Sequence, residues 1–134
     1  MKEMFLNYEE SINEEINKIN RLYDGKEETI KDLKILDEIL IRINKVINNV
    51  LDLSTEFIEF KELGVYKKRI NSFDILEKNN VIDKEVKKSL EALCGLKDMN
   101  MNNRDEIDAN NVIYIINNKF KEVKDFLSNI SKNI

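Results

Sequence analysis

The sequence predicts an all-α fold, an antiparallel helical bundle of about five helices. Apolar residues recur at steps of three and four along most of the chain, and no segment keeps a period of two. The chain has no proline and only three glycines, so long stretches are free of helix breakers. A length of 134 residues with 42% hydrophobic residues suits one domain, and we expect residues 1–134 to form a single helical domain.

Two long helices are expected in the N-terminal half. The first covers residues 2–23 and ends before Gly25, because glycine suits the left-handed position after a helix. The second covers residues 27–63 and ends at Gly64. At 1.5 Å per residue such a helix would be on the order of 50 Å long, more than a compact domain of this size can hold. We therefore expect it to project or to bend near residues 52–55, where serine and threonine can bond the preceding turn.

The second helix carries two overlapping apolar seams at heptad spacing, so its apolar stripe is wide. One interpretation is a core helix of an elongated bundle. The other is that one seam faces a second copy of the chain. We expect the homodimer, with a seam formed by Ile39, Val46, Leu53 and Phe60.

Three shorter helices complete the expected bundle. The first of them covers residues 65–80 and stops at two asparagines. Asp83 can cap the next helix, in which Cys94 occupies an apolar position. After a polar stretch, Asp108 can cap the last helix. Its apolar stripe consists of Val112, Ile113, Ile116, Phe120, Val123, Leu127 and Ile130.

The composition excludes whole classes of function. The chain has no histidine, which excludes Ser-His-Asp and Cys-His nucleophilic sites and all histidine-ligated metals. Cys94 is the single cysteine, so no internal disulfide or thiolate-rich zinc site can form. The glycines are too far apart for a phosphate-binding loop, and no apolar run is long enough for a signal peptide or a membrane span. We expect a cytoplasmic protein with no cofactor, no metal and no membrane association.

The basic residues gather in the middle of an acidic chain. The net charge is −4, whereas residues 61–97 carry nine basic and six acidic residues. Such a segment could give weak affinity for phosphate groups of RNA. The competing interpretation is that its lysines only keep two helices soluble. The candidate phosphate-binding residues are Lys67, Lys68, Arg69, Lys84, Lys87 and Lys88.

From residue 72 onward the order of elements resembles that of a known family. Residues 73–77 (FDILE), 80–86 (NVIDKEV) and 93–98 (LCGLKD), followed by the last helix, resemble the HepT-like branch of the HEPN superfamily. The resemblance implies an all-helical, dimeric, metal-independent ribonuclease toxin. It also implies a minimal nucleotidyltransferase antitoxin as the partner.

The resemblance places the family's signature at residues 97–104, and this chain departs from it. The signature is arginine, four residues, histidine, one residue and tyrosine. Here Lys97 stands at the arginine, Asp98 at the asparagine that usually follows, Asn102 at the histidine and Arg104 at the tyrosine. An amide cannot move a proton near neutral pH, and lysine lacks the bidentate fork of arginine.

We therefore expect a catalytically degenerate HepT-like protein that acts as a dimeric binding or regulatory module. Its expected setting is a prokaryotic toxin–antitoxin or defence system. Two alternatives stay open. The first is a ribonuclease of the HepT type whose atypical site uses Lys97, Asp98, Asn102 and Arg104. The second is a structural helical bundle of an unrelated family.

Overall fold

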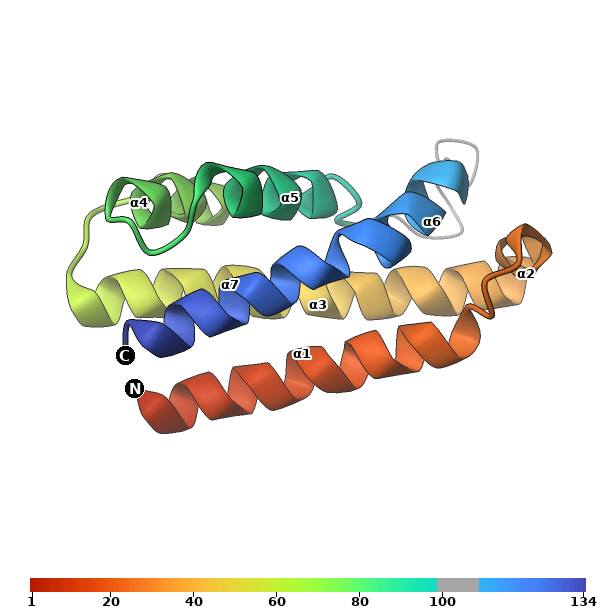
Figure 1. Ribbon diagram of the computed structural model, residues 1–134, viewed down its shortest axis with the longest axis horizontal. Coiled ribbons are helices and arrows are strands. Elements are labelled where there is room, and N and C mark those ends of the chain that lie inside the picture. Colours follow the sequence, from red (N-terminus) through yellow and green to blue (C-terminus); the bar gives the residue numbers. More distant parts are fainter. Residues whose placement is uncertain (99–108) are drawn as a thin grey trace.

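The computed structural model describes residues 1–98 and 109–134, and within these ranges all regular structure is helical. Four columns of helix lie lengthwise against one another, with both termini at the same end (Figure 1). The predicted all-α bundle is confirmed. The helices are α1 (Lys2–Leu22), α2 (Glu27–Lys31), α3 (Leu33–Lys61), η1 (Arg69–Asn71, one 3₁₀ turn), α4 (Ser72–Lys78), α5 (Lys84–Cys94), α6 (Ala109–Asn118) and α7 (Phe120–Lys132).

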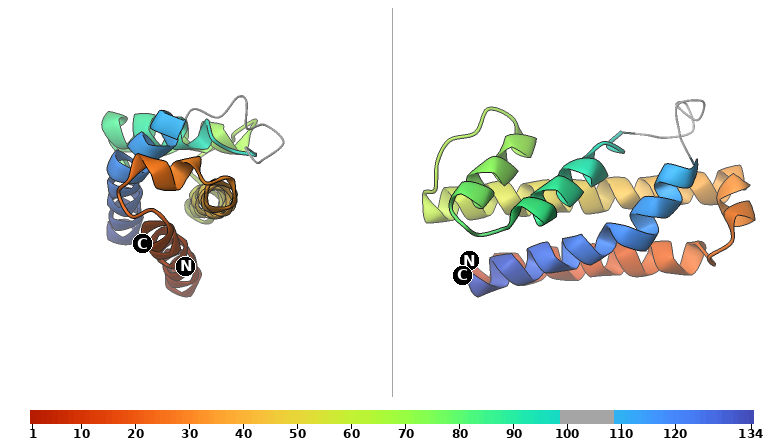
Figure 2. Two further views of the ribbon diagram at one scale, coloured as in Figure 1. Left: turned by 90° about the vertical axis from the view of Figure 1, so that its right-hand side faces the viewer. Right: turned by 45° about the horizontal axis from the view of Figure 1, so that its top comes forward.

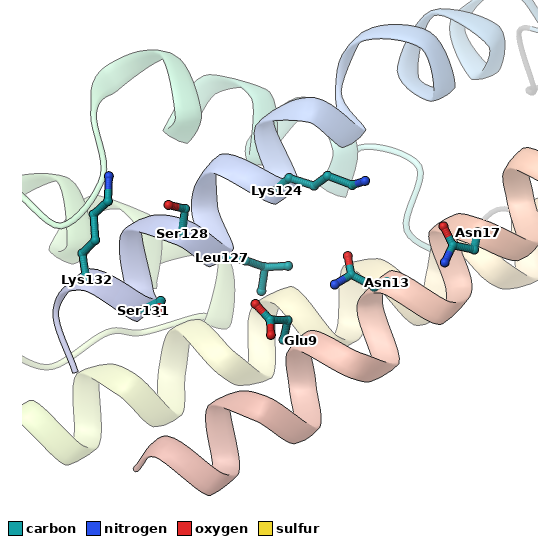
Figure 3. Close-up of a pocket in the computed structure, with 8 residues that line it drawn as sticks. All are labelled: Glu9, Asn13, Asn17, Lys124, Leu127, Ser128, Ser131 and Lys132. Atoms are coloured by element: carbon teal, nitrogen blue, oxygen red, sulfur yellow. The ribbon is translucent and has the colours of Figure 1, made fainter.

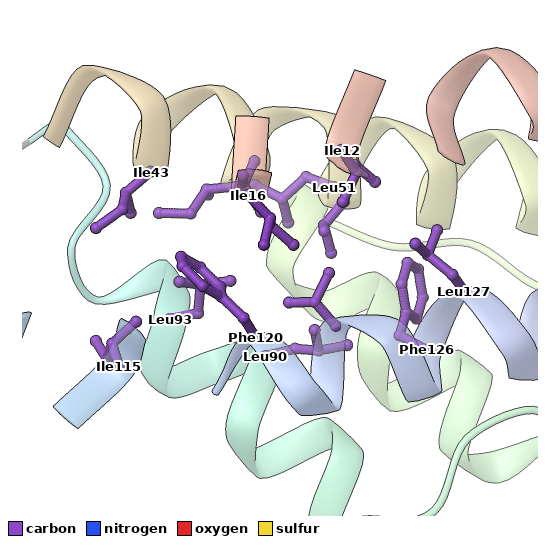
Figure 4. Packing of buried hydrophobic residues seen from close by; sticks show 14 of the residues in the cluster. Ile12, Ile16, Ile43, Leu51, Leu90, Leu93, Ile115, Phe120, Phe126 and Leu127 are labelled. Atoms are coloured by element: carbon purple, nitrogen blue, oxygen red, sulfur yellow. The ribbon is translucent and has the colours of Figure 1, made fainter. Parts of the chain in front are cut away.

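Successive columns run in opposite directions. The columns are α1, α3, the pair of α4 and α5, and the pair of α6 and α7, and they surround a common interior in the end-on view of Figure 2. Apolar side chains from all four columns meet there (Figure 4). Phe73 of α4 packs edge-on against Phe126 of α7, with ring centroids 6.4 Å apart and an interplanar angle of 80°. A shared interior of this kind makes each column depend on the others.

Polar contacts fix the register of α1 against α3. The hydroxyl of Tyr8 donates to Glu56 Oε1 at 2.9 Å, and Asn49 Nδ2 donates to Ser11 Oγ at 2.9 Å. One turn further along α1, Arg42 Nη1 lies 3.4 Å from Glu15 Oε2. Because these three contacts follow one another along the middle of α1, a shift by one helical turn would break all of them.

The expected helix over residues 27–63 is divided, but not where a bend was expected. α3 continues through residues 52–55, and the break lies at Asp32 instead. Asp32 has extended backbone, with ψ of 113°, and its Oδ1 accepts hydrogen bonds from the amides of Lys34 (3.0 Å) and Ile35 (3.4 Å). It is therefore the N-cap of α3. The break turns α2 away from α3, and it shortens the long helix to residues 33–61.

Two other expected helices are also divided. Residues 62–68 are not helical, and only η1 and α4 form within the range 65–80. The last helix is interrupted at Lys119, which separates α6 from α7. Next to that interruption, Asn118 Nδ2 donates to the carbonyl of Tyr114 at 3.0 Å, a side-chain bond that competes with the backbone ladder. By contrast Asp83 caps α5 as expected, since its Oδ1 accepts from the amide of Val86 at 2.8 Å. The expected cap at Asp108 lies outside the described residues.

Over the described ranges, no helix combines the length and the apolar character that a crossing of the bilayer needs.

Candidate functional site

The motif-equivalent residues begin immediately after α5. The backbone continues in turns past Cys94, because the amide of Lys97 donates to the carbonyl of Cys94 at 3.0 Å. Lys97 Nζ lies 3.2 Å from Asp98 Oδ2, and Asp98 has a left-handed φ of 67°. Asn102 and Arg104 lie outside the described residues. The structure therefore places Lys97 and Asp98, the first two of the predicted motif-equivalent residues, directly after α5.

A row of polar side chains on α3 contacts this segment through a hydrogen bond. Asn44, Asn48 and Asp52 are spaced four residues apart and so share one face of α3, which we call the α3 polar row. Asn44 Oδ1 accepts a hydrogen bond of 2.7 Å from the backbone amide of Asp98. Its Nδ2 donates to the carbonyl of Leu40 at 3.1 Å, which fixes the orientation of the amide. The row thus anchors the chain at the point where the signature begins.

Arg69 of η1 binds the same row. Its Nη1 lies 2.6 Å from Asp52 Oδ1, and its Nη2 donates to Asn48 Oδ1 at 3.2 Å. The side chain is 40% exposed. Asn44 and Asn48 are one helical turn apart, so the guanidinium binds α3 roughly 5 Å or more along the helix from the Asp98 anchor. Residues from η1, from α3 and from the end of α5 therefore converge along one edge of α3.

Cys94 lies close to these cations but is not an activated thiol. Burial, followed by the charge of Glu91, raises the pKa of the Cys94 thiol to about 11, and the charges of Lys97 and Arg69 oppose this rise. The side chain is half-buried and packs against the core, as the sequence predicted. A thiol that stays protonated at neutral pH is a poor nucleophile.

The six basic candidates differ in their contacts. Lys87 is paired within the chain, at 2.7 Å from Asp74 and 3.7 Å from Glu77, and the hydrogen bond with Asp74 is the main cause of its raised pKa. Of the six, Arg69 is the residue that contacts the α3 polar row. The remaining four are exposed and have no ion pair within the part of the chain that the structure describes: Lys67, Lys68, Lys84 and Lys88.

The proposed dimer seam is wrong for three of its four residues. Ile39, Val46 and Leu53 are each 0% exposed within a single chain, so they cannot face a second subunit. The physical reason is that the apolar face of α3 is covered within the chain, by α1 on one side and by η1 and α4 on another. Phe60, near the end of α3, is 61% exposed. The wide apolar stripe thus serves the core of the chain itself.

The α3 polar row was not among the predicted site residues. Its positions do leave a pattern in the sequence, since Asn44, Asn48 and Asp52 interrupt an apolar helix at a strict interval of four. Such an interval is equally typical of a solvated helix face. Only the fold shows that Asp98, 54 residues from Asn44, reaches this face.

A hollow lies elsewhere, along the groove between α1 and α7 (Figure 3). It has a volume of about 680 Å³, and its polar lining mixes amides, hydroxyls and both signs of charge. Across residues 1–98 and 109–134, no three carboxylate or thiol groups are placed to hold a metal ion. The residues lining the groove are Glu9, Asn13, Asn17, Lys124, Leu127, Ser128, Ser131 and Lys132.

The four-column bundle defines the class of this chain as an all-helical bundle protein over the residues that the structure describes. The chain belongs to the HepT-like family, because the family described as ribonuclease HepT-like matches residues 12–130. This match covers most of the chain and includes both α3 and the segment after α5.

Known relatives agree with this assignment. The mRNA nuclease HepT of Shewanella oneidensis is 18% identical over 127 residues, which cover 95% of this chain and 96% of the relative. A crystal structure of a toxin–antitoxin with AMP-PNP has a TM-score of 0.90 at 18% identity, covering 97% of this chain and 98% of the other. The tri-AMPylated HEPN toxin of Shewanella oneidensis in complex with MNT antitoxin also gives 0.90 at 18% identity, covering 98% and 99%. These structural likenesses establish a shared fold.

Proposed function

We propose that this chain is the HepT-like member of a toxin–antitoxin pair and that its ribonuclease site is degenerate. In this role it acts as a binding or regulatory module rather than as an enzyme. Its proposed partner is a minimal nucleotidyltransferase antitoxin. Two facts support the pairing: the chain is a HepT-like family member, and its fold matches that of a HEPN toxin in complex with MNT antitoxin.

The observation that carries the proposal is the chemistry around the end of α5. The described side chains there are an ammonium, a guanidinium, amides, carboxylates and a thiol with a pKa raised to about 11. None of these described groups is an imidazole, the side chain that most often acts as a general acid or base. Cleavage of RNA through its 2′-hydroxyl requires a group that accepts a proton and another that donates one. The whole sequence holds no histidine to fill either role.

An RNA-cleavage time course in EDTA tests the proposal directly. The mRNA nuclease HepT of Shewanella oneidensis, purified in the same way, serves as the positive control. We expect cleavage by the relative and none by this chain. Cleavage that follows the monodisperse protein peak and is lost in Asn102→Ala would overturn the degenerate site.

Rebuilding the family signature offers a matched gain-of-function test. The triple variant Lys97→Arg, Asn102→His, Arg104→Tyr restores the arginine, the histidine and the tyrosine at their family positions. We expect this variant to cleave RNA, because it regains both a titratable imidazole and a bidentate cation. The control carries Lys97→Arg and Arg104→Tyr with Asn102 unchanged, and it should remain inactive. If the triple variant folds but does not cleave RNA, the signature substitutions alone do not explain the absence of ribonuclease activity.

The partner is tested separately. We expect the chain to co-purify with the product of a neighbouring nucleotidyltransferase gene after co-expression. We also propose that the chain forms a homodimer, as the family resemblance implies, through surfaces other than the buried seam of α3. Failure to co-purify under low salt would contradict the toxin–antitoxin assignment without affecting the cleavage result.

A ribonuclease with an atypical site is the second candidate. Membership of a family described as ribonuclease favours it, and so do the two cation–carboxylate pairs, Lys97 with Asp98 and Arg69 with Asp52, along one edge of α3. The EDTA time course separates the two candidates, because only the second gives cleavage by the unmodified chain.

A further inference from the structure

Arg69, which is not a position of the family signature, is held close to the predicted signature segment in this chain. The α3 polar row holds Arg69 through Asp52 and Asn48, at 2.6 and 3.2 Å, and holds the backbone of Asp98 through Asn44 at 2.7 Å. Neighbouring members of the row are four residues apart, about 6 Å along the helix. Arg69 and the segment that begins with Lys97 therefore share one short stretch of α3.

We propose that Arg69 is a phosphate-binding residue of this chain, supplying the bidentate contact to an RNA backbone that Lys97 cannot make. This inference rests on the proposed function, because it assigns a ligand class to the same degenerate site. A guanidinium presents donors in a planar fork that matches two phosphate oxygens, whereas an ammonium acts as a point charge. The chain thus retains a fork-shaped cation near its signature, contributed by η1 instead of α5.

The geometry around Arg69 leaves room for a ligand. A guanidinium has five N–H donors, and the contacts with Asp52 and Asn48 engage one on each terminal nitrogen. The side chain is 40% exposed, so its remaining donors are within reach of solvent. Asp52 and Asn48 hold the group in one orientation, which lowers the entropy that a ligand contact would cost.

A purely structural clamp between η1 and α3 is the competing explanation. An exposed arginine–aspartate pair contributes little to the free energy of unfolding, so a clamp of this kind would stabilise the fold only slightly. The two explanations differ for Asp52→Asn. An amide oxygen still accepts from the guanidinium, but the positive charge of Arg69 is no longer neutralised. Phosphate affinity should then increase, while a structural clamp predicts no increase.

The test measures binding of the full chain to a fluorescent single-stranded 2′-O-methyl oligoribonucleotide by anisotropy. This probe has RNA phosphates but cannot be cleaved through its 2′-oxygens. We expect Arg69→Gln to weaken binding about tenfold and to lower the slope of log affinity against log salt by about 0.7, the value for one phosphate contact on a single strand. We expect Asp52→Asn to tighten binding several-fold.

Lys78→Gln, at the end of α4, is the matched control, because it removes the same charge at a residue outside the candidate phosphate-binding set. Lys78 is exposed and makes no ion pair among the described residues, so its loss should change affinity by less than about twofold. Equal losses in Arg69→Gln and Lys78→Gln would overturn the proposal, since they would indicate a general charge effect. Absence of binding by the unmodified chain at low salt would overturn it as well.

A fourth variant guards against a folding artefact. Arg69→Lys keeps a cation that can pair with Asp52 but removes the fork, and we expect it to bind between threefold and tenfold more weakly than the unmodified chain. Unchanged affinity in a folded Arg69→Lys would overturn the bidentate contact. Because the probe cannot be cleaved, these results are independent of the cleavage time course. RNA cleavage by the unmodified chain would overturn the degenerate site and leave the assignment of Arg69 to be decided by affinity alone.

Discussion

Ser54 and Ser72 join α3 to α4 through a hydrogen bond inside the core. Both residues are 0% exposed, and their Oγ atoms are 2.6 Å apart. A buried hydroxyl that loses its partner keeps the cost of desolvation without the compensating bond. The effect of a buried hydroxyl on stability therefore depends on whether its hydrogen-bond partner is present.

We expect Ser72→Ala to lower the free energy of unfolding by about 1–3 kcal/mol, because it leaves the Ser54 hydroxyl without that partner. The double variant Ser54→Ala, Ser72→Ala should lose less than the sum of the two single variants, since no orphaned hydroxyl remains. Urea denaturation monitored by circular dichroism measures all three. Strict additivity would show that the two hydroxyls do not depend on each other.

Cys94 provides a prediction about pH. Its pKa is raised from 9.0 to about 11, chiefly by burial, so at pH 8 its thiolate fraction is about 100-fold smaller in the folded chain than in the unfolded chain. Reaction with a disulfide reagent at pH 8 should slow by a similar factor and should become fast in urea. Because the folded-state pKa is the raised one, this thiol stabilises the fold below about pH 9, and its contribution is lost as the pH rises towards 11. A fast reaction at pH 8 without denaturant would contradict the burial of Cys94.

At the scale of elements, Asp32 decides where the long helix begins. Its carboxylate accepts from two backbone amides at the start of α3, which would otherwise lack partners. We expect Asp32→Ala to lower the free energy of unfolding by about 1 kcal/mol. Asp32→Asn should be nearly neutral, because asparagine is an equally good N-cap. Thermal or urea unfolding tests both, and equal effects of alanine and asparagine would exclude a capping role.

The helices could be predicted from apolar spacing, but their interruptions could not. Spacing of three and four continues from Ile30 through Leu33 and Leu36, so it does not reveal the cap at Asp32 between them. Val65 was expected to begin a helix, yet it is 96% exposed in an irregular connection. Local sequence defines which face of a helix is apolar, whereas the length of each element depends on what packs against it.

The candidate site was predicted in part for a similar reason. Lys97 and Asp98 follow from the resemblance to the family, because the order of elements positions them in sequence. The α3 polar row does not, since its contact with Asp98 joins residues 54 apart and exists only once α3 and α5 have packed. Arg69 was identified as a basic residue, but its attachment to Asp52 and Asn48 is a tertiary contact that composition cannot indicate.

At the scale of the whole molecule, α3 is one of four columns around a shared interior, and it packs against α1, α2, η1 and α4. Its apolar stripe resembles a coiled-coil seam because a bundle helix and a dimerising helix need the same periodicity. The pattern cannot say whether the partner surface belongs to the same chain or to another. Burial within one chain answers this for Ile39, Val46 and Leu53.

Two substitutions on α3 separate core from surface. Val46 is 0% exposed, whereas Ile41, on the same helix, is 41% exposed. We expect Val46→Asp to unfold the chain, because it buries a carboxylate without a partner. Ile41→Glu should keep the helical circular dichroism signal and a cooperative transition. Light scattering of the folded species should give about twice the chain mass of 15.9 kDa for the unmodified protein. If Val46→Asp were folded and monomeric while the unmodified chain is dimeric, the dimer interface would include Val46. That result would contradict the packing described for α3.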